Sequence, residues 1–378
     1  MPTRFRPLAA VVTAATLTAT LAGCASPLPH KAAPEATDRI NDLRRNHSEL
    51  PAGAELEAAG TQEGHVPDVD GAEPSWRPSV ENDAGTKNDA GTENEADRNT
   101  PEGRVPDIVK RGRLIVGVDP SLNLLSFREG ATGELRGFEI DLAREIARDI
   151  FGDPDKVDFK FFNTSGPEDA IDSGQVDLLL RNTSITPERQ EDMAFSIPYL
   201  RADIRLLTNV DSPITAARET AGRTVCASRD STPVDQARKD TPMANILITR
   251  SWSDCLMAIQ EGQADAVITD DTILSGMVAQ DPYTHIVGEA LNTSYYGAVI
   301  PKPTRAHDTR GLIRQVNSTI ERVRDDDTLH HLHDKWFGPY LDYQPLPAPQ
   351  YYPADKEPAL ARDSQRTRDA VIKEADRG

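Results

Sequence analysis

The stretch GFEIDLAREIARDIF, residues 137–151, carries the clearest secondary-structure signal in the chain. Its large apolar residues recur every four positions, at Phe138, Leu142, Ile146 and Ile150. This period predicts a helix with one apolar face. Apolar strands are predicted on both sides of the helix, RLIVGV at 113–118 and VDFKFF at 157–162. A strand, a helix and a second strand in this order are typical of α/β layers with largely parallel sheets.

The same alternation continues toward residue 340. Further predicted strands are VDLLL (176–180), IRLLTN (204–209), TVCAS (224–228), NILIT (245–249), ADAVITD (264–270) and YGAVIP (296–301). Predicted helices lie around EDAIDSG (168–174), at WSDCLMAIQEG (252–262) and along the amphipathic segment 309–338. In open α/β sheets, ligands bind beyond the carboxyl ends of the strands. Polar residues that directly follow a strand are therefore the candidates for a binding site.

Composition limits the class of protein. The chain has 378 residues, enough for two or three domains, and a formal net charge of −19, which argues against nucleic acid as a partner. Only 38% of the residues are hydrophobic, so part of the chain is predicted to be unfolded. Residues 24–105 are acidic and hold one aromatic residue, Trp76, so we expect a disordered tether there, with a short helix at 36–46 as the alternative. The proline-rich and charged residues 344–378 are predicted to be a tail.

The N-terminus has the pattern of an export signal. Arg4 and Arg6 precede a short apolar stretch that ends in LAGC at 21–24. This pattern resembles a bacterial lipobox and predicts a signal peptide over residues 1–23 and a lipid on Cys24. The alternative is an ordinary signal peptide in which Cys24 is incidental. No later stretch is long and apolar enough to cross a bilayer, so the remainder is expected to be exported and soluble.

Two cysteines remain once Cys24 is set aside, namely Cys226 and Cys255. An oxidising compartment favours a disulfide between them. A metal site is the rival interpretation, but two sulfurs without a nearby histidine would be a poor zinc shell. The sequence therefore predicts a structural disulfide.

Polar residues follow four of the predicted strands. Asp119 follows RLIVGV, the run from Arg181 to Ser184 follows VDLLL, and Asp270 ends ADAVITD. SRDSTP, residues 228–233, follows TVCA in the same way. Together they offer guanidinium groups, hydroxyls, N–H groups and carboxylates. An α-carboxylate is bound well by arginine and N–H groups, and an ammonium by a carboxylate, so this set is predicted to bind a zwitterion.

Several motifs between residues 107 and 340 resemble one family. They are GRLIVGVD (112–119), GELRGFEIDLAREIA (133–147), VDLLLRNTSITPER (176–189), FSIPYL (195–200), ADAVITDD (264–271) and DKWFG (334–338). In this order they resemble the family-3 solute-binding proteins of ABC importers for polar amino acids. DSPIT, VCAS, DCLMAIQ, TDDTIL and DPYTHIVG resemble in particular the actinobacterial GlnH-like glutamine- and glutamate-binding lipoproteins.

The resemblance implies an α/β fold of the two-lobed periplasmic-binding type II, with the ligand in the cleft between the lobes. It assigns residues 106–203 and 295–343 to lobe 1 and residues 204–294, with the disulfide, to lobe 2. The chain would cross between the lobes near 199–203 and again near 295–297.

The resemblance also implies a set of ligand-binding residues: Asp119, Arg181, Asn182, Ser184, Arg189, Arg229, Thr232 and Asp270. In this set Arg189, Ser184 and the Thr232 amide would bind the α-carboxylate. Asp270 would bind the ammonium with the Asn182 carbonyl. The other three would lie near the side chain of the ligand. Arg229 stands one position after the place where some relatives carry a ligand-contacting lysine.

The predicted side-chain pocket departs from the family pattern. Where relatives commonly hold the ligand between aromatic rings, this sequence has Leu122 and Thr164. Arg181 stands where glutamine binders have a small residue. We therefore expect Arg181 to bind a side-chain carboxylate and the protein to prefer glutamate or aspartate over glutamine or asparagine. If instead Asp119 faces the ligand and Arg181 turns away, the preference is inverted.

Simpler interpretations exist for several of these residues. Arg189 could cap a helix, Arg181 could pair with Asp119 or Asp177, Asp271 could be the working carboxylate in place of Asp270, and Thr232 could be a turn residue. The histidines at 330, 331 and 333 lack the i, i+4 spacing of a helical metal site, so a solvated helix end is expected there and no metal.

Two other classes of function fit the same motifs. A sensor would use the same cleft to report an amino acid to a membrane partner. A dehydratase, as some relatives on this fold are, would need a catalytic acid beside a bound ring, and these motifs hold no additional acid. The expectation is a monomeric binding protein without a cofactor that delivers an amino acid to an ABC permease at the outer face of the membrane.

Overall fold

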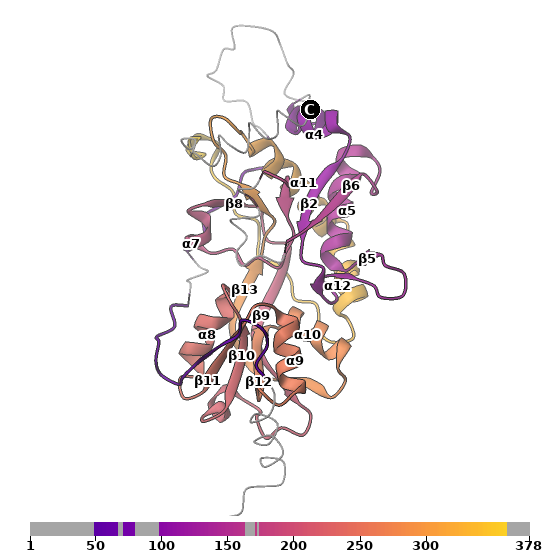
Figure 1. The fold of residues 1–378 in the computed structure, drawn as a ribbon. Coiled ribbons are helices and arrows are strands. Elements are labelled where there is room, and N and C mark those ends of the chain that lie inside the picture. Colours follow the sequence, from indigo (N-terminus) through magenta and orange to yellow (C-terminus); the bar gives the residue numbers. More distant parts are fainter. Residues whose placement is uncertain (1–48, 67–70, 80–97, 163–170, 172–173, 361–378) are drawn as a thin grey trace, which may run out of the picture. The chain divides into compact units, whose positions relative to one another are not determined.

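Two mixed sheets organise the computed structural model of this chain, which describes residues 49–66, 71–79, 98–162, 171 and 174–360 (Figure 1). All of these residues belong to one compact unit, residues 41–378. We call the part built on the five-stranded sheet lobe 1 and the part built on the six-stranded sheet lobe 2.

Lobe 1 has a sheet in which parallel strands meet antiparallel ones. Its strands, in spatial order, are β6 (Val157–Phe161), β2 (Leu114–Val118), β7 (Leu178–Leu179), β14 (Val299–Pro301) and β8 (Met193–Phe195). β2 is parallel to β6 and β7, whereas β14 is antiparallel to its neighbours. Helix α5 (Phe138–Phe151) buries the apolar face that its four-residue period predicts, and α11 (Arg310–Asp325) and α12 (Thr328–Phe337) pack against it.

Lobe 2 has helices on both faces of its sheet. Its strands, in spatial order, are β1 (Glu55–Glu57), β11 (Asn245–Thr249), β10 (Thr224–Ser228), β12 (Ala266–Asp270), β9 (Leu200–Asn209) and β13 (Thr284–Tyr296). The helices are α8 (Thr232–Asp240), α9 (Trp252–Gln260) and α10 (Asp271–Gln280). Val225 on β10 shares a core cluster with Val234 of α8, whereas its neighbour Cys226 packs with Leu256 of α9. Because successive strand residues point to opposite faces, α8 and α9 cover opposite faces (Figure 1).

Two paired strands connect the lobes. β9 and β13 run antiparallel, with Leu200 to Asp203 opposite Tyr296 to Thr293, and we call this paired part the hinge. The lobes also meet directly, since the side-chain amide of Asn123 in lobe 1 donates to the carbonyl of Gly276 in lobe 2 over 3.1 Å. The predicted α/β class and two-lobed organisation are thus observed.

The other described elements are short. They are β3 (Ser121–Leu122), β4 (Ser126–Arg128) and β5 (Leu135–Arg136), which form a small sheet, the helices α3 (Pro101–Arg104), α4 (Pro106–Arg111) and α7 (Pro187–Gln190), and two 3-10 turns at Ala217–Thr220 and Ala354–Lys356. The helix expected at 168–174 falls largely outside the described residues. No helix among the described residues is both long and apolar enough to span a membrane.

The expected tether differs from what its described part shows. Residues 55–57 are a strand of the lobe 2 sheet, and Trp76 is 6% exposed in the core of lobe 1. α3, also inside the expected tether, packs on α11. The prediction of disorder was wrong for these residues, because backbone pairing and one buried aromatic ring compensate for the low apolar content. Cys24, the signal peptide and the helix at 36–46 lie outside the described residues.

The expected C-terminal tail also contains packed residues. Tyr351 forms a β-bridge with Ser75, and its hydroxyl donates to Glu321 over 2.7 Å. Glu357 accepts from Arg314 of α11 over 2.6 Å. Residues 344–360 therefore pack on lobe 1 rather than extending away from it, while residues 361–378 lie outside the described part.

Candidate functional site

The loop between β7 and α7 holds most of the predicted residues. Asn182 has a φ of +45°, a left-handed conformation that asparagine tolerates better than most residues, and its N–H donates to Glu139 over 2.6 Å. Thr186 caps α7 by accepting from the N–H of Arg189. This cap orients Arg189, whose guanidinium donates to the carbonyl of Ser184 over 3.0 Å. Arg189 therefore lies inside α7 and does not cap it, which differs from the simpler interpretation, and its side chain turns back to the loop.

Asp270 of lobe 2 reaches the same loop through Tyr296. Ser184 forms a β-bridge with Tyr296, whose hydroxyl donates to one carboxylate oxygen of Asp270 over 2.5 Å. The other oxygen, Oδ1, is buried and accepts no hydrogen bond from any described residue. Burial raises the pKa of Asp270 to about 6, although the Tyr296 hydrogen bond and the charge of Arg189 lower it. The structure therefore brings Ser184, Arg189 and Asp270 together.

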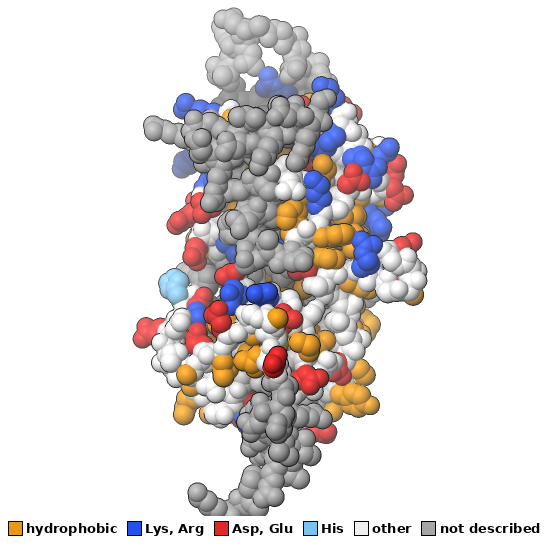
Figure 2. Space-filling model, in the orientation of Figure 1, with side chains coloured by type: hydrophobic (Ala, Val, Ile, Leu, Met, Phe, Trp, Pro, Cys, Tyr) orange, Lys and Arg blue, Asp and Glu red, His pale blue; other side chains and the backbone are white. Residues whose placement is uncertain are grey.

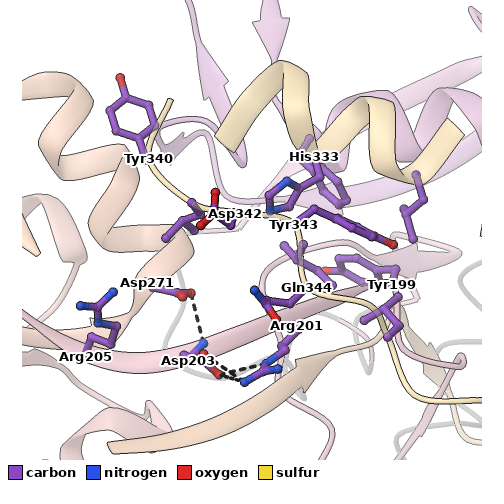
Figure 3. A pocket seen from close by; sticks show the side chains of 15 residues that line it. Tyr199, Arg201, Asp203, Arg205, Asp271, His333, Tyr340, Asp342, Tyr343 and Gln344 are labelled. Carbon is purple, nitrogen blue, oxygen red and sulfur yellow. Dashed lines mark hydrogen bonds and ion pairs between the residues drawn. The ribbon is translucent and has the colours of Figure 1, made fainter. Parts of the chain in front are cut away.

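Asp271 points away from this group. Its carboxylate accepts from the N–H of Asp203 over 3.1 Å and lines a cavity of about 250 Å³ beside the hinge (Figure 3). Arg201, His333 and the segment 340–344 line the same cavity, whereas Asp270 does not. Burial raises the pKa of Asp271 to about 7. The two adjacent aspartates thus face different surroundings, and Asp270 is the one beside Arg189.

Asp119 and Arg181 meet at the end of β2. Their side chains are 3.8 Å apart and each is 16% exposed. Glu139, fully buried at the first turn of α5, lies close enough for both charges to act on it. Burial raises the pKa of Glu139 to about 7, and hydrogen bonds from Tyr199 and Asn182 and the charge of Arg181 oppose the rise. The alternative pairing of Arg181 with Asp119 is therefore present, while Asp177 pairs with Arg111 instead.

Two predicted residues belong to the lobe 2 side. Thr232 is the first residue of α8, and the preceding Ser231 does not cap the helix because its hydroxyl donates to the carbonyl of Ser228. Arg229 follows β10, and its guanidinium donates to Glu55 of β1 over 2.8 Å. The structure thus turns Arg229 onto the N-terminal strand, which differs from the expected ligand contact.

Leu122 and Thr164 stand where relatives commonly have aromatic rings, and only Leu122 lies among the described residues. Leu122 is 4% exposed and lies against Trp252, Ile273 and Met277 of lobe 2. It therefore fills the contact between the lobes. Thr164 lies outside the described residues.

The remaining predictions concern cysteine, histidine and overall charge. Cys226 on β10 and Cys255 on α9 form the predicted disulfide, with their Cα atoms 5.6 Å apart.

His333 is 5% exposed and packs on Phe337, so the expected solvated helix end was wrong for this residue. The described residues contain no group of three or more His, Cys, Asp or Glu side chains that could hold a metal ion. On the visible face, acidic and basic side chains are interspersed (Figure 2).

A protein-family model agrees with this geometry. Residues 114–339 match the bacterial extracellular solute-binding proteins, family 3. The chain belongs to this family. The match spans both lobes and the hinge and excludes residues 49–79 and 340–360.

Individual members of the solute-binding family are similar over much of their length. A glutamine-binding protein from Geobacillus stearothermophilus is 34% identical over 199 residues, which are 52% of this chain and 76% of that protein. The ABC transporter glutamine-binding protein GlnH of Bacillus subtilis (strain 168) is 27% identical over 64% of this chain and 87% of its own. Both relatives are named as binding proteins, and the family is one of solute-binding proteins, which agrees with the expected binding role.

A solved structure of the same fold extends the comparison. An ancestral amino acid-binding protein, a precursor of cyclohexadienyl dehydratase, matches with a TM-score of 0.55 and 27% sequence identity. The match covers 61% of this chain and 98% of the other. It confirms the two-lobed fold of the solute-binding protein.

Two residues of the site were missed in the sequence. Glu139 belongs to the α5 motif GFEIDL, and a carboxylate in the first turn of a helix is ordinarily explained by the helix dipole alone. Tyr296 belongs to the predicted strand YGAVIP. A glutamate next to the apolar Phe138 and Ile140 was the one available signal for Glu139, and nothing in the sequence indicated the hydrogen bond of Tyr296 to Asp270.

Proposed function

We propose that this solute-binding protein captures a polar amino acid between its lobes and delivers it to an ABC permease. The observation that carries the proposal is the buried carboxylate of Asp270, which lies near enough to Arg189 for the guanidinium charge to act on it and has one oxygen that accepts no hydrogen bond from any described residue. A buried polar atom without a partner is costly, so an incoming donor would be favoured there. The α-ammonium of an amino acid supplies such a donor.

The α-carboxylate of the same ligand would be bound by the positively charged guanidinium of Arg189. Arg189 is anchored to the Ser184 carbonyl, and a guanidinium binds a carboxylate through two parallel hydrogen bonds. The uncapped first turn of α8 adds the N–H of Thr232 from lobe 2, at a helix end that favours anions. Binding by groups from both lobes would stabilise the closed arrangement, and this closure would be the signal to the permease.

The side chain of the ligand would meet Asp119 and Arg181. We propose glutamate or aspartate as preferred ligands and glutamine or asparagine as weaker ones, because Arg181 offers a cation beside the pocket. The two relatives named above are glutamine-binding proteins, which support a polar amino acid of this size. We further propose that lipid on Cys24 holds the exported protein at the outer face of the membrane.

Calorimetric titration with the twenty amino acids tests the proposal, using Asp270→Asn and Asp271→Asn as a matched pair. We expect Asp270→Asn to weaken binding at least about ten-fold, because hydrogen bonds to charged groups contribute roughly 1.5–3 kcal/mol. Asp271→Asn should stay within about three-fold of wild type, since its carboxylate faces the hinge cavity.

The pH dependence provides an independent check. Asp270 must lose its proton to bind an ammonium, and its pKa is raised to about 6. Wild-type affinity should therefore be constant above pH 7 and fall about ten-fold per pH unit below pH 6, whereas Asp270→Asn should lack this dependence. Binding of no amino acid, or equal losses in the two variants, would refute the proposed function.

A further inference from the structure

Residues 49–66 pack on lobe 2 and residues 71–79 on lobe 1, although both ranges precede the residues that match the family. On lobe 2, β1 pairs antiparallel with β11, with Glu55 opposite Ile248 and Glu57 opposite Ile246. Glu57 also forms an ion pair with Arg238 of α8 over 2.8 Å, and both side chains are largely buried. These contacts attach the first half of the segment to lobe 2.

The attachment to lobe 2 continues beyond β1. The N–H of Ala59 donates to the Asn245 side chain over 3.1 Å, and the N–H of His65 donates to Asp235 over 3.3 Å. Gly64 lies so close to the carbonyl of Asp235 that an added Cβ would collide with it. The chain therefore follows α8 closely until residue 65, and only a glycine fits at position 64.

The second half of the segment is attached to lobe 1. The side-chain amide of Gln190 exchanges two hydrogen bonds with the backbone of Glu73, of 2.7 and 3.0 Å. The hydroxyl of Ser75 donates to the carbonyl of Phe195 over 2.8 Å. Trp76 is buried and lies edge-on to Tyr352 of the C-terminal segment, with ring centres 5.2 Å apart. These contacts attach the second half of the segment to lobe 1.

The attachment on lobe 2 begins at the rim of the ligand site. β10, β11 and β12 are parallel, so their carboxyl ends, including Asp270, share one edge of the sheet. β1 runs in the opposite direction, so its first residue, Glu55, lies at that same edge and holds Arg229 there. In Figure 1 the indigo segment leaves this sheet and rises toward α7 of lobe 1.

We propose that residues 49–66 and 71–79 are the two anchors of an intramolecular clasp that ties lobe 2 to lobe 1 and slows the release of bound ligand. From His65 to Glu73 the chain makes eight steps, which span at most about 29 Å when fully extended. This length limits how far the two anchors can separate while both stay attached. The inference about ligand release rests on the proposed function, whereas the inference about lobe separation does not.

Cutting the clasp tests the inference. A recognition sequence for a site-specific protease is inserted between residues 66 and 71 in one variant, and between residues 79 and 98 in the control. Both cuts break the chain ahead of the family domain, but only the first lies between the two anchors. Each protein is compared before and after cleavage, so any effect of the insertion itself cancels.

Two readouts are measured. The first is the distance between spin labels on the exposed Asp155 of lobe 1 and Glu261 of lobe 2 in ligand-free protein. The second is the rate of amino-acid dissociation by stopped flow. After the first cut we expect a longer and broader distance distribution and dissociation about ten-fold faster, a factor that corresponds to about 1.4 kcal/mol. The control cut should change neither.

A point variant repeats the test without cleavage. Gly64→Ala should displace the segment from α8 and give the same two changes, whereas Gly71→Ala, where a Cβ meets Pro187 at 3.4 Å, should not. Unchanged label distances after the first cut would refute the clasp, whether or not the protein binds an amino acid. If the distances change while wild type binds no amino acid, the clasp stands and the proposed function fails.

Discussion

Arg181 lies between two acids of different character. Asp119 is partly exposed and lies 3.8 Å away, whereas Glu139 is fully buried. The cation offsets Asp119, which would otherwise repel an acidic ligand side chain. Since Glu55 holds Arg229, Arg181 is the remaining predicted cation for a side-chain carboxylate.

Replacing Arg181 tests its role in selectivity. We expect Arg181→Gln to weaken glutamate binding by about 10- to 150-fold, since a hydrogen bond to a charged group contributes roughly 1.5–3 kcal/mol. Glutamine binding should change less than about three-fold. Calorimetry with both ligands measures the difference, with the surface variant Arg113→Gln as the control. Equal losses for both ligands, or a wild type that prefers glutamine, would show that Arg181 serves only Asp119.

The sequence indicates the place of a candidate residue in the fold where the end of a strand determines it. Asp119 and Ser184 come after strands of the lobe 1 sheet, Asp270 ends a strand of the lobe 2 sheet, and within each sheet the carboxyl ends of parallel strands share one edge. The direction of a long side chain is not determined in this way. Arg229 is at the expected position, but its guanidinium binds Glu55, a residue 174 positions away in the sequence. Such a partner has no local signal.

At the scale of elements, α5 combines an apolar face with a buried carboxylate at its first turn. Glu139 accepts hydrogen bonds from the hydroxyl of Tyr199 and from the N–H of Asn182. It therefore connects α5 to the loop between β7 and α7 and to the residue before β9. Its pKa of about 7 is well above the ordinary value of 4.5, because burial disfavours the charged form. The folded protein thus binds this proton more tightly than the unfolded chain does.

This raised pKa predicts a pH-dependent effect of Glu139→Gln. Through Glu139, the free energy of unfolding of wild type falls as pH rises from about 4.5 to about 7. The variant lacks this loss, so its stability relative to wild type should be roughly 2–3 kcal/mol higher at pH 8 than at pH 5. Urea unfolding at the two pH values measures it, with the exposed Glu134→Gln as the control. A difference that does not vary with pH would place the pKa of Glu139 near its ordinary value.

The predicted elements agree with the structure where the apolar pattern is long. The four-residue period of α5 and the apolar runs of β10 and β12 were sufficient because whole faces are buried. β1 was missed because its three residues, Glu-Leu-Glu, leave Leu56 exposed and gain their stability from backbone pairing and ion pairs. A strand with so little apolar surface has no recognisable sequence pattern.

At the scale of the whole molecule, the expectation from composition was wrong for the described parts of both segments that flank the family domain. Residues 49–66, 71–79 and 344–360 pack on the lobes instead of extending away from them. The fraction of apolar residues in a segment does not indicate where a single aromatic ring lies. The ring centres of Trp76 and Tyr352 are 5.2 Å apart, and the N–H of Tyr352 donates to the carbonyl of Ser75 over 2.9 Å. These contacting residues are 276 or more positions apart in the sequence, so no local pattern indicates the contact.

The position of β1 at the end of the lobe 2 sheet has a practical consequence for solubility. A protein shortened to residues 106–343 would leave β11 as a strand with unpaired N–H and C=O groups, which are a template for pairing with another chain. Ile246 and Ile248 would no longer be opposite Glu57 and Glu55. We expect the shortened protein to self-associate with rising concentration in light scattering, and a protein that begins at residue 49 to remain monomeric. On this expectation, a strand of only three residues, Glu-Leu-Glu, prevents self-association of the protein by covering β11.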